Sequence, residues 1–224
     1  MTERELPQND SVETRLVLAS ASPRRAEILS ALGIPFTVSP ADLDETVGPD
    51  ESGRAAASRL AAAKAAICAD RHPGKWVLAA DTLVLLEGAV LGKPRDESEA
   101  REMLRRLSGR DHRVVTAVQL RKADGPELEA VEESRVRIAR LDEEEIRWYV
   151  STGEPLDKAG SYAVQGLGAR FVESVNGSFT NVMGLPARSV YRLLRGAPDP
   201  ALARLALSSG PASSRTSARP LPRG

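Results

Sequence analysis

Short, wholly apolar runs separated by helical patterns are the feature that most limits how this chain can fold. Residues 16–19 and 76–80 hold no polar side chain and are too short for helices, so each predicts a buried strand. Residues 35–38 predict a further short strand, whereas residues 23–32 and 52–69 carry apolar residues at helical spacing. This alternation of strands and helices predicts an α/β fold.

The later part of the chain adds signals for antiparallel strands. Glu87-Gly88 has the form of a two-residue hairpin turn, and Asp142 with Glu145 forms a capping box. The elements predicted there are strands at 83–86, 89–91, 113–120, 131–138 and 171–175, and helices at 96–107, 142–150 and 187–194. Together these elements predict a mixed sheet with flanking helices, as one domain or as two lobes around a cleft.

The composition divides the chain into three parts. We expect a flexible polar leader at residues 1–14 and one folded domain at residues 15–196. Residues 197–224 are rich in Pro, Ser and Arg, and we expect a mostly disordered tail with at most one helical turn at residues 202–207.

The charge balance and the single cysteine exclude several classes of protein. The 31 Lys and Arg residues match the 31 Asp and Glu residues, so the chain lacks the broad positive field of a protein that coats nucleic acid. One cysteine excludes an internal disulfide framework and suits a reducing compartment. No run approaches the roughly 18 apolar residues of a membrane span. We therefore expect a soluble, cytoplasmic protein with no stable nucleic-acid partner and no membrane partner.

Ser20-Ala21-Ser22-Pro23-Arg24-Arg25 stands between a predicted strand and a predicted helix. Backbone N–H groups at a helix N-terminus, two hydroxyls and two guanidiniums form a set that binds phosphate oxygens. A helix capped by Ser22, with two solvated arginines, is the alternative that these residues leave open.

Asp81-Thr82 comes directly after the apolar run at residues 76–80. In open α/β folds ligands lie beyond the carboxyl ends of the strands, so Asp81 is a candidate general base or metal ligand. A turn or N-cap aspartate is the alternative.

Gly92-Lys93-Pro94-Arg95 follows the predicted hairpin and aims one ammonium group from a stiff turn. Such a group suits a phosphate contact, although a solvated lysine is the alternative. The spacing of a P-loop is missing.

The segment from Asp157 to Gly166 is rich in glycine, which permits close approach to a ligand. Gln165 within it could donate to and accept from the edge of a base. The alternative is a structural loop between lobes.

Metal ligands other than carboxylates are not expected. His72 and His112 are isolated, and no Cys/His grouping has the spacing of a zinc site. Cys68 lies in an apolar helical pattern, as a core residue does. A bound metal would therefore have carboxylate ligands, which favours Mg²⁺ or Mn²⁺.

Six segments in order resemble the Maf family of nucleoside triphosphate pyrophosphatases: LASASPRRAEIL, AADTLV, LGKP, LSGRDHRVVTAV, GEPLDKAGSYAVQGLGARFV and NVMGLP. The resemblance covers about residues 16–194. It implies an elongated, mixed α/β fold similar to that of inosine triphosphatases, with the nucleotide in a central cleft. It also implies cleavage between the α- and β-phosphates of a nucleoside triphosphate, which releases a monophosphate and pyrophosphate, with a divalent metal cation as cofactor.

The resemblance implies roles for the charged residues as well. Asp81 matches the family's proposed proton acceptor, which activates the attacking water. Glu45 matches an acidic position that helps to hold metal or water, so Glu45 and Asp81 are the predicted metal ligands. Lys64 and Lys93 match further cations that contact the phosphates.

The remaining matched residues concern phosphate binding and substrate choice. Ser20, Arg24 and Arg25 match the phosphate-binding corner, and Arg24, Thr82 and Gln165 match positions linked to substrate choice. The paired arginines and Gln165 resemble the branch of the family that prefers dTTP and UTP. The branch that resembles a 7-methyl-GTP pyrophosphatase tends to carry glutamate where Gln165 stands. A glutamine amide suits the O4/N3 edge of uracil or thymine, which is why we expect dTTP and UTP as substrates.

Three alternatives remain beside this expectation. The chain could be a non-catalytic, nucleotide-binding regulator of cell division, or a 7-methyl-GTP-type pyrophosphatase of the same family. The basic tail could recruit a partner. An exposed face on the last predicted helix would also permit a homodimer.

Overall fold

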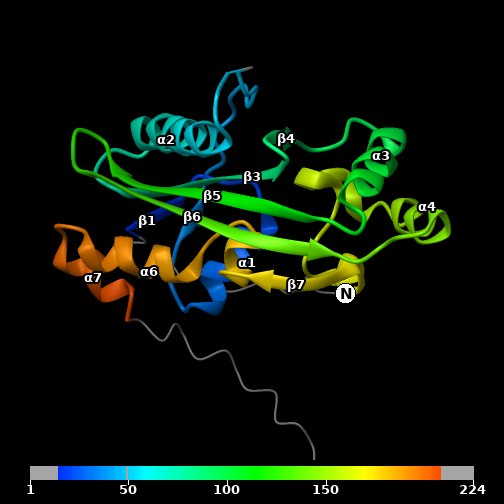
Figure 1. Ribbon diagram of the computed structural model, residues 1–224. Helices are drawn as coiled ribbons and strands as arrows, with labels where there is room; N and C mark the ends of the chain where they lie inside the picture. The colour runs from blue at the N-terminus through cyan, green and yellow to red at the C-terminus, as the bar shows by residue number, and fades with distance from the viewer. Residues whose placement is uncertain (1–14, 49, 208–224) are drawn as a thin grey trace, which may run out of the picture.

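The computed structural model describes residues 15–48 and 50–207, and a seven-stranded mixed sheet runs through them (Figure 1). The strand order is β2-β1-β3-β5-β6-β7, and β4 pairs with the outer edge of β3. β1 is parallel to β2 and β3, whereas the other pairs are antiparallel. The strands are β1 Leu16–Leu18, β2 Thr37–Val38, β3 Trp76–Leu86, β4 Ala89–Leu91, β5 Asp111–Lys122, β6 Glu127–Ile138 and β7 Val172–Asn176.

Helices cover both faces and one end of this sheet. In Figure 1, α2 lies over one face, α1, α6 and α7 lie under the other, and α3 and α4 lie at one end. The α-helices are α1 Pro23–Ala31, α2 Gly53–Arg71, α3 Glu97–Leu107, α4 Glu143–Ser151, α5 Phe179–Val182, α6 Ala187–Gly196 and α7 Pro200–Leu205. Three short 3₁₀ segments are η1 Glu154–Asp157, η2 Ala159–Ser161 and η3 Gly166–Phe171. The predicted mixed α/β fold is confirmed.

The apolar run of β1 is buried because helices pack on both sides of it. Leu16 and Leu18 belong to the core between the sheet and the helices α1 and α6, while Val17 packs with Ala65 and Cys68 of α2. Successive strand residues point to opposite faces, so a strand covered on both sides must be apolar throughout.

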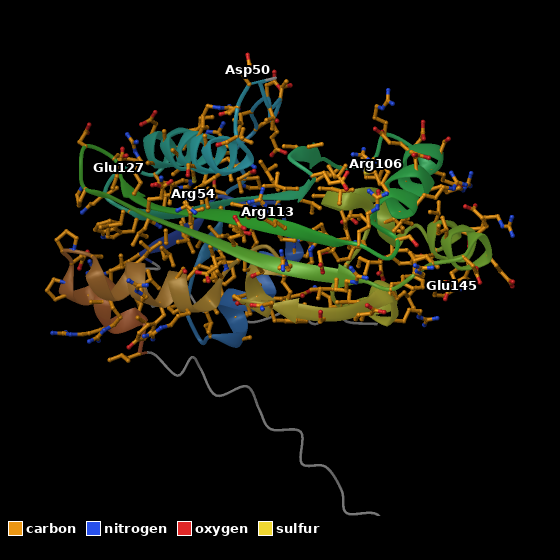
Figure 2. The ribbon with its side chains drawn as sticks, in the orientation of Figure 1. Asp50, Arg54, Arg106, Arg113, Glu127 and Glu145 are labelled. Atoms are coloured by element: carbon orange, nitrogen blue, oxygen red, sulfur yellow. The ribbon has the colours of Figure 1, made fainter. Side chains whose placement is uncertain are left out.

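The charged side chains labelled in Figure 2 lie on the outside of the molecule.

Several local predictions are confirmed by the backbone and the caps. Glu87 and Gly88 both have positive φ, 52° and 87°, as a hairpin turn with two left-handed residues requires. Asp96 accepts a hydrogen bond from the backbone N–H of Glu99 at the start of α3. The capping box of Asp142 and Glu145 is present at the start of α4. The turn and the two caps therefore fix where these elements begin and end.

Some predicted strand boundaries are wrong. The strand predicted at residues 76–80 continues to Leu86, since Asp81 pairs with Ala117 and Thr82 with Thr116 of β5. β5 and β6 are likewise longer than predicted, whereas the strand predicted at residues 35–38 is reduced to β2. Pairing with a long neighbour extends a strand through polar residues that a sequence pattern reads as its end.

The segment after residue 196 does not begin as a disordered tail. Residues 200–205 form α7, in which Leu202 is fully buried. Trp76 of β3 donates a 2.9 Å hydrogen bond from Nε1 to Oδ2 of Asp199, the N-cap of α7. The folded region thus extends past the predicted boundary, while the leader (1–14) and the rest of the tail (208–224) lie outside the described residues.

Within residues 15–48 and 50–207, no helix combines the length and the apolar character that crossing a membrane requires.

Candidate active site

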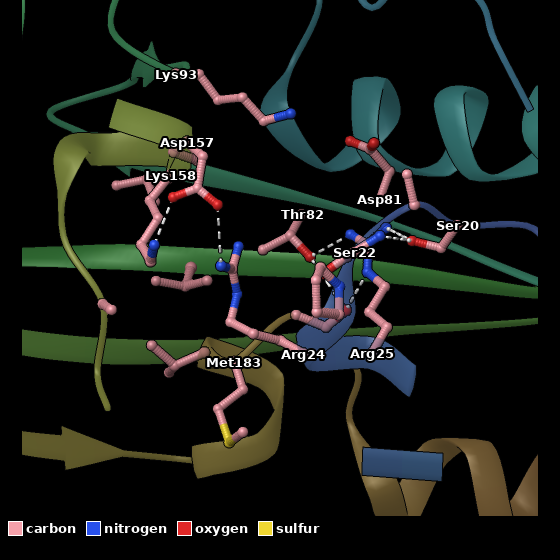
Figure 3. Close-up of a pocket in the computed structure, with 18 of the residues that line it drawn as sticks. Ser20, Ser22, Arg24, Arg25, Asp81, Thr82, Lys93, Asp157, Lys158 and Met183 are labelled. Atoms are coloured by element: carbon pink, nitrogen blue, oxygen red, sulfur yellow. Dashed lines mark hydrogen bonds and ion pairs between the residues drawn. The ribbon is translucent and has the colours of Figure 1, made fainter. Parts of the chain in front are cut away.

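A cavity of about 300 Å³ opens where the outer edge of β3 is left without a strand partner (Figure 3). β1 pairs with β3 only as far as Leu78, and β4 begins to pair at Val84. The stretch of β3 between these residues therefore borders the cavity, and the chain that leaves β1 lines the other side.

All nine residues predicted for the site line this one cavity: Ser20, Arg24, Arg25, Glu45, Lys64, Asp81, Thr82, Lys93 and Gln165. They come from six separate segments of the chain, which the sheet and the helices α1 and α2 bring together. Five basic and three acidic side chains line the cavity, so cations prevail locally in a chain with no net charge.

Asp81 and Thr82 reach the cavity from the middle of a strand, not from its end as predicted. Neighbouring strand residues point to opposite faces. Asp81 accordingly contacts Lys64 of α2, and Thr82 contacts Arg25 of α1. Both side chains nevertheless border the same cavity, because this stretch of β3 has no strand partner on the side of β1 and β4.

Lys64 holds two carboxylates together on the α2 side of the cavity. Its buried Nζ lies 2.6 Å from Oδ1 of Asp81, which is also buried, and 2.6 Å from Oε1 of the exposed Glu45. Burial alone would raise the pKa of Glu45. The hydrogen bond and charge of Lys64, with the charges of Lys93 and Arg25, outweigh burial and hold that pKa below its usual value. Both carboxylates are therefore oriented toward one point.

Arg25 uses its guanidinium to hold the opposite wall. Nε donates to the carbonyl of Gly184 at 2.8 Å, and the two terminal nitrogens donate to Ser20 Oγ at 3.2 Å and Thr82 Oγ1 at 3.1 Å (Figure 3). Loss of water around this group lowers the pKa of Arg25, which the charges of Asp81 and Glu45 oppose. Arg25 thereby links α1, β3 and the turn after α5.

Arg24 is held much more loosely than its neighbour. Among residues 15–48 and 50–207 it makes one ion pair, which joins NH1 to Oδ2 of Asp157 at 3.6 Å, and Asp157 also binds Lys158. Burial would raise the pKa of Asp157, but the hydrogen bond and charge of Lys158, with the charge of Arg24, lower it below its usual value. The Arg24 side chain points along the cavity (Figure 3) and is free to turn toward an anion.

The start of α1 also faces the cavity. Ser22 is the N-cap residue, but its side chain makes no capping hydrogen bond, so the predicted cap is wrong. Ser20 Oγ instead accepts from the backbone N–H of Ser22 at 3.2 Å. The first N–H groups of α1 are consequently not capped by a side chain, and such groups bind phosphate oxygens.

Lys93 and Gln165 complete the predicted set. Figure 3 shows Lys93 reaching over the cavity. The N–H of Gly160 donates to the carbonyl of Gly92 at 3.0 Å, which joins the segment of Lys93 to the glycine-rich segment. Gln165 is half-buried, and its Oε1 is buried without a hydrogen-bond partner in the part of the chain that the structure describes. This acceptor is available to a ligand that carries an N–H group.

The sequence did not single out several residues that also line the cavity. Met183 and Gly184 come from the NVMGLP segment, for which the sequence predicts no role. Gly184 has φ of +108°, a conformation that favours glycine, and it presents its carbonyl to Arg25. Tyr162, Asp157 and Lys158 belong to the glycine-rich segment, of which only Gln165 had been assigned. The glycine itself, which tolerates a positive φ, is the only sequence signal for this position.

No group of three or more His, Cys, Asp or Glu residues that could hold a metal occurs among the described residues. The pair formed by Glu45 and Asp81 is a smaller donor set, but it suits Mg²⁺ or Mn²⁺, which are often bound by one or two carboxylates together with substrate phosphates.

Comparison with known proteins identifies the family of the chain. The family described as Maf-like protein matches residues 15–197, which include every residue of the cavity. This chain belongs to the Maf-like protein family. A dTTP/UTP pyrophosphatase of Anaeromyxobacter dehalogenans (strain 2CP-1 / ATCC BAA-258) is 55% identical over 189 residues, which cover 83% of this chain and 95% of that protein. A dTTP/UTP pyrophosphatase of Myxococcus xanthus (strain DK1622) is 53% identical over 188 residues, covering 84% and 95%.

Among solved structures, the Staphylococcus aureus Ham1 protein matches with a TM-score of 0.44 and 16% identity. The match covers 70% of this chain and 79% of that one.

Proposed function

We propose that this chain hydrolyses dTTP and UTP between the α- and β-phosphates, releasing the nucleoside monophosphate and pyrophosphate. The observation that supports this most is the convergence of five cations and a pair of oriented carboxylates on one cavity. The names of relatives that are 53–55% identical over 95% of their length support the choice of substrate.

The triphosphate would lie along the basic wall of the cavity. Arg24 and Lys93 are the cations whose side chains can turn toward it, Lys158 adds positive charge from its place beside Asp157, and the N-terminus of α1 adds backbone N–H groups. Arg25 is already occupied by Ser20, Thr82 and Gly184, so its role is to shape the site and to add positive charge.

Asp81 is the proposed general base. Lys64 donates to Oδ1, which fixes the carboxylate and leaves Oδ2 to accept a proton from the attacking water. Since the Lys64–Asp81 pair is buried, the orientation of that oxygen is set before the nucleotide binds.

We further propose Mg²⁺ or Mn²⁺ as the cofactor, held by Glu45, Asp81 and the phosphates. The two carboxylate oxygens meet at the Lys64 ammonium, which occupies the position of a cation between them. A bound divalent cation would neutralise charge on the phosphates as the pyrophosphate leaves.

Gln165 supports a pyrimidine that carries an N3–H group. Its unpartnered Oε1 can accept from N3–H of thymine or uracil, and its amide N–H can donate to O4. Cytosine presents the reverse pattern, an acceptor at N3 and a donor at N4, which the same amide can match after a half-turn. Gln165 therefore supports a pyrimidine substrate and does not by itself separate CTP from dTTP and UTP.

The test of this proposal is a panel of separate nucleotides with Mg²⁺: dTTP, UTP, CTP, GTP and 7-methyl-GTP, with pyrophosphate and orthophosphate both measured. Pyrophosphate from dTTP and UTP is the expected result. Turnover of 7-methyl-GTP in their place would favour the other branch of the family. Tight binding without turnover of any nucleotide would favour the regulator.

A cytoplasmic location and a homodimer stay predictions. The single cysteine, Cys68, is buried and supports a reducing compartment.

A further inference from the structure

The segment that carries Gln165 is held from behind by two residues that do not line the cavity. Residues 162–165 form part of the cavity wall, and Gln165 stands at the end of this stretch. Tyr149 of α4 and Glu154 of η1 lie outside the set of lining residues. Both nevertheless contact the chain on either side of Gln165.

Glu154 binds the chain just after Gln165. Its Oε2 accepts from the backbone N–H of Leu167 and its Oε1 from that of Gly168, both at 2.9 Å. Burial would raise the pKa of Glu154, but these two N–H groups and the Tyr149 hydroxyl outweigh it and lower that pKa below its usual value. The side chain is therefore an ionised, charge-assisted acceptor for two backbone donors.

Tyr149 binds the chain just before Gln165 and also fixes Glu154. Its hydroxyl donates to Glu154 Oε1 at 2.8 Å and accepts from the backbone N–H of Ala163 at 3.2 Å. The ring is fully buried, against Phe171 and other core residues. One rigid aromatic residue thus connects both ends of the segment 163–168.

Two glycines show how closely this clamp fits the segment. A Cβ at Gly166, where φ is +73°, would lie 2.7 Å from Glu154 Oε2. A Cβ at Gly168 would lie 2.4 Å from the Tyr149 hydroxyl. Neither position can carry a side chain unless the clamp moves, so the backbone on both sides of the Glu154 carboxylate is fixed at contact distance.

We propose that Glu154, oriented by Tyr149, is the positioning residue for Gln165 and thereby sets discrimination between bases. This inference rests on the proposed function, because Gln165 must meet the base of the substrate. The Oε1 atom of Gln165 has no hydrogen-bond partner among the described residues. Its position is therefore set by the backbone segment that carries Gln165. Loss of these contacts would let residues 163–168 move, so the Oε1 acceptor would no longer have one fixed position. The residues that contact the phosphates, and Asp81, would stay unchanged.

The test is steady-state kinetics of Glu154→Gln with dTTP and with GTP. A glutamine keeps the shape but offers one oxygen where the carboxylate offers two, so at least one of the two N–H groups loses its acceptor. We expect the ratio of kcat/KM for dTTP to that for GTP to fall about tenfold, mainly through a higher KM for dTTP. Tyr149→Phe, which keeps the buried ring, should lower the ratio about threefold.

Matched variants separate positioning from general damage. Glu144→Gln makes the same chemical change on an exposed part of α4 and should leave the ratio unchanged. In Gly166→Ala the added methyl group would displace the Glu154 carboxylate, so this variant should lower the ratio as Glu154→Gln does. In a Gln165→Ala background, Glu154→Gln should lower the ratio no further, because the residue through which it acts is gone.

An equal loss of activity on dTTP and GTP, or a full further loss in the Gln165→Ala background, would overturn the inference while the wild type remained a dTTP pyrophosphatase. A wild type that releases no pyrophosphate from dTTP or UTP would overturn the proposed function, and this inference with it. The two failures are distinguishable because the second is seen before any variant is compared.

Discussion

The ammonium of Lys64 lies 2.6 Å from Oδ1 of Asp81, and both groups are buried. The same nitrogen lies 2.6 Å from Oε1 of Glu45, so one lysine bridges two carboxylates at the edge of the sheet. Removal of either partner from a buried ion pair leaves an uncompensated charge, which is costly. A metal that binds between these two carboxylates must therefore compete with Lys64.

Lys64→Met should let the nucleotide-free protein bind Mn²⁺ more tightly than the wild type does. The substitution leaves Glu45 and Asp81 without their cation, and we expect the affinity to rise at least about tenfold, or about 1.4 kcal/mol. Titration followed by electron paramagnetic resonance of free Mn²⁺ measures this without turnover. Lys75→Met, at the start of β3, is the control and should not change the affinity. Unchanged Mn²⁺ binding in Lys64→Met would show that these carboxylates are not the metal ligands.

The two adjacent arginines should behave differently when each is changed to lysine. Arg25 makes three hydrogen bonds that a lysine cannot reproduce, so Arg25→Lys should lower the free energy of unfolding by about 2 kcal/mol. Arg24 makes one loose ion pair, so Arg24→Lys should change it by at most about 0.5 kcal/mol yet still raise KM for dTTP. Urea denaturation and kinetics on both variants measure the contrast. Equal losses of stability would contradict the assignment of Arg25 to the wall and Arg24 to the phosphates.

Truncation should separate α7 from the residues that follow it. A chain that ends at Arg195 loses the buried Leu202 and the hydrogen bond between Asp199 and Trp76. Its free energy of unfolding should fall by about 3 kcal/mol or more, as for the loss of a large core side chain. A chain that ends at Leu207 keeps α7 and should match the full chain in urea denaturation. If both truncated chains were as stable as the full chain, α7 would contribute nothing to the fold.

Acidification should destabilise the protein through His112 before the carboxylates titrate. The imidazole is buried, its Nε2 lies 2.7 Å from the Tyr162 hydroxyl, and burial lowers the pKa of His112 to about 4. The unfolded chain binds this proton below about pH 6.5, whereas the folded chain does so only near pH 4, so stability falls as pH falls through that window. Between about pH 7.5 and pH 5 the loss should be about 2 kcal/mol.

His112→Gln removes the titrating group and should flatten the dependence of the unfolding free energy on pH above about pH 5. Urea denaturation at the two pH values measures both proteins. The same slope in the variant as in the wild type would assign the effect to other groups.

The composition of the site could be predicted further than its geometry. Seven of the nine predicted residues that line the cavity lie in the six family-like segments, where reactive side chains at chain reversals are visible in a single sequence. Glu45 and Lys64 lie outside those segments and follow only from the family resemblance. The pairing of Asp81 with Ala117 is not visible there, because the two residues lie more than thirty positions apart, and the sequence pattern alone predicts Asp81 at the end of a strand. The division of labour between Arg24 and Arg25 depends on Gly184, which is far along the chain.

The same limit applies to α7 and to the clamp on Gln165. A short helix rich in Ala and Pro becomes stable only because Leu202 and Asp199 find partners in the core and in β3. Glu154 has no special signal beside the many other glutamates, because its partners are backbone N–H groups. Contacts of this kind are set by the tertiary fold and not by a local pattern.

The most direct measurement of the central claim is pyrophosphate release from dTTP and UTP with Mg²⁺, for the wild type and for Asp81→Asn. We predict release by the wild type and a loss of roughly 10²–10⁴-fold in kcat in the variant, with dTTP still bound. Wild-type levels of pyrophosphate from Asp81→Asn, or none from the wild type, would contradict the account.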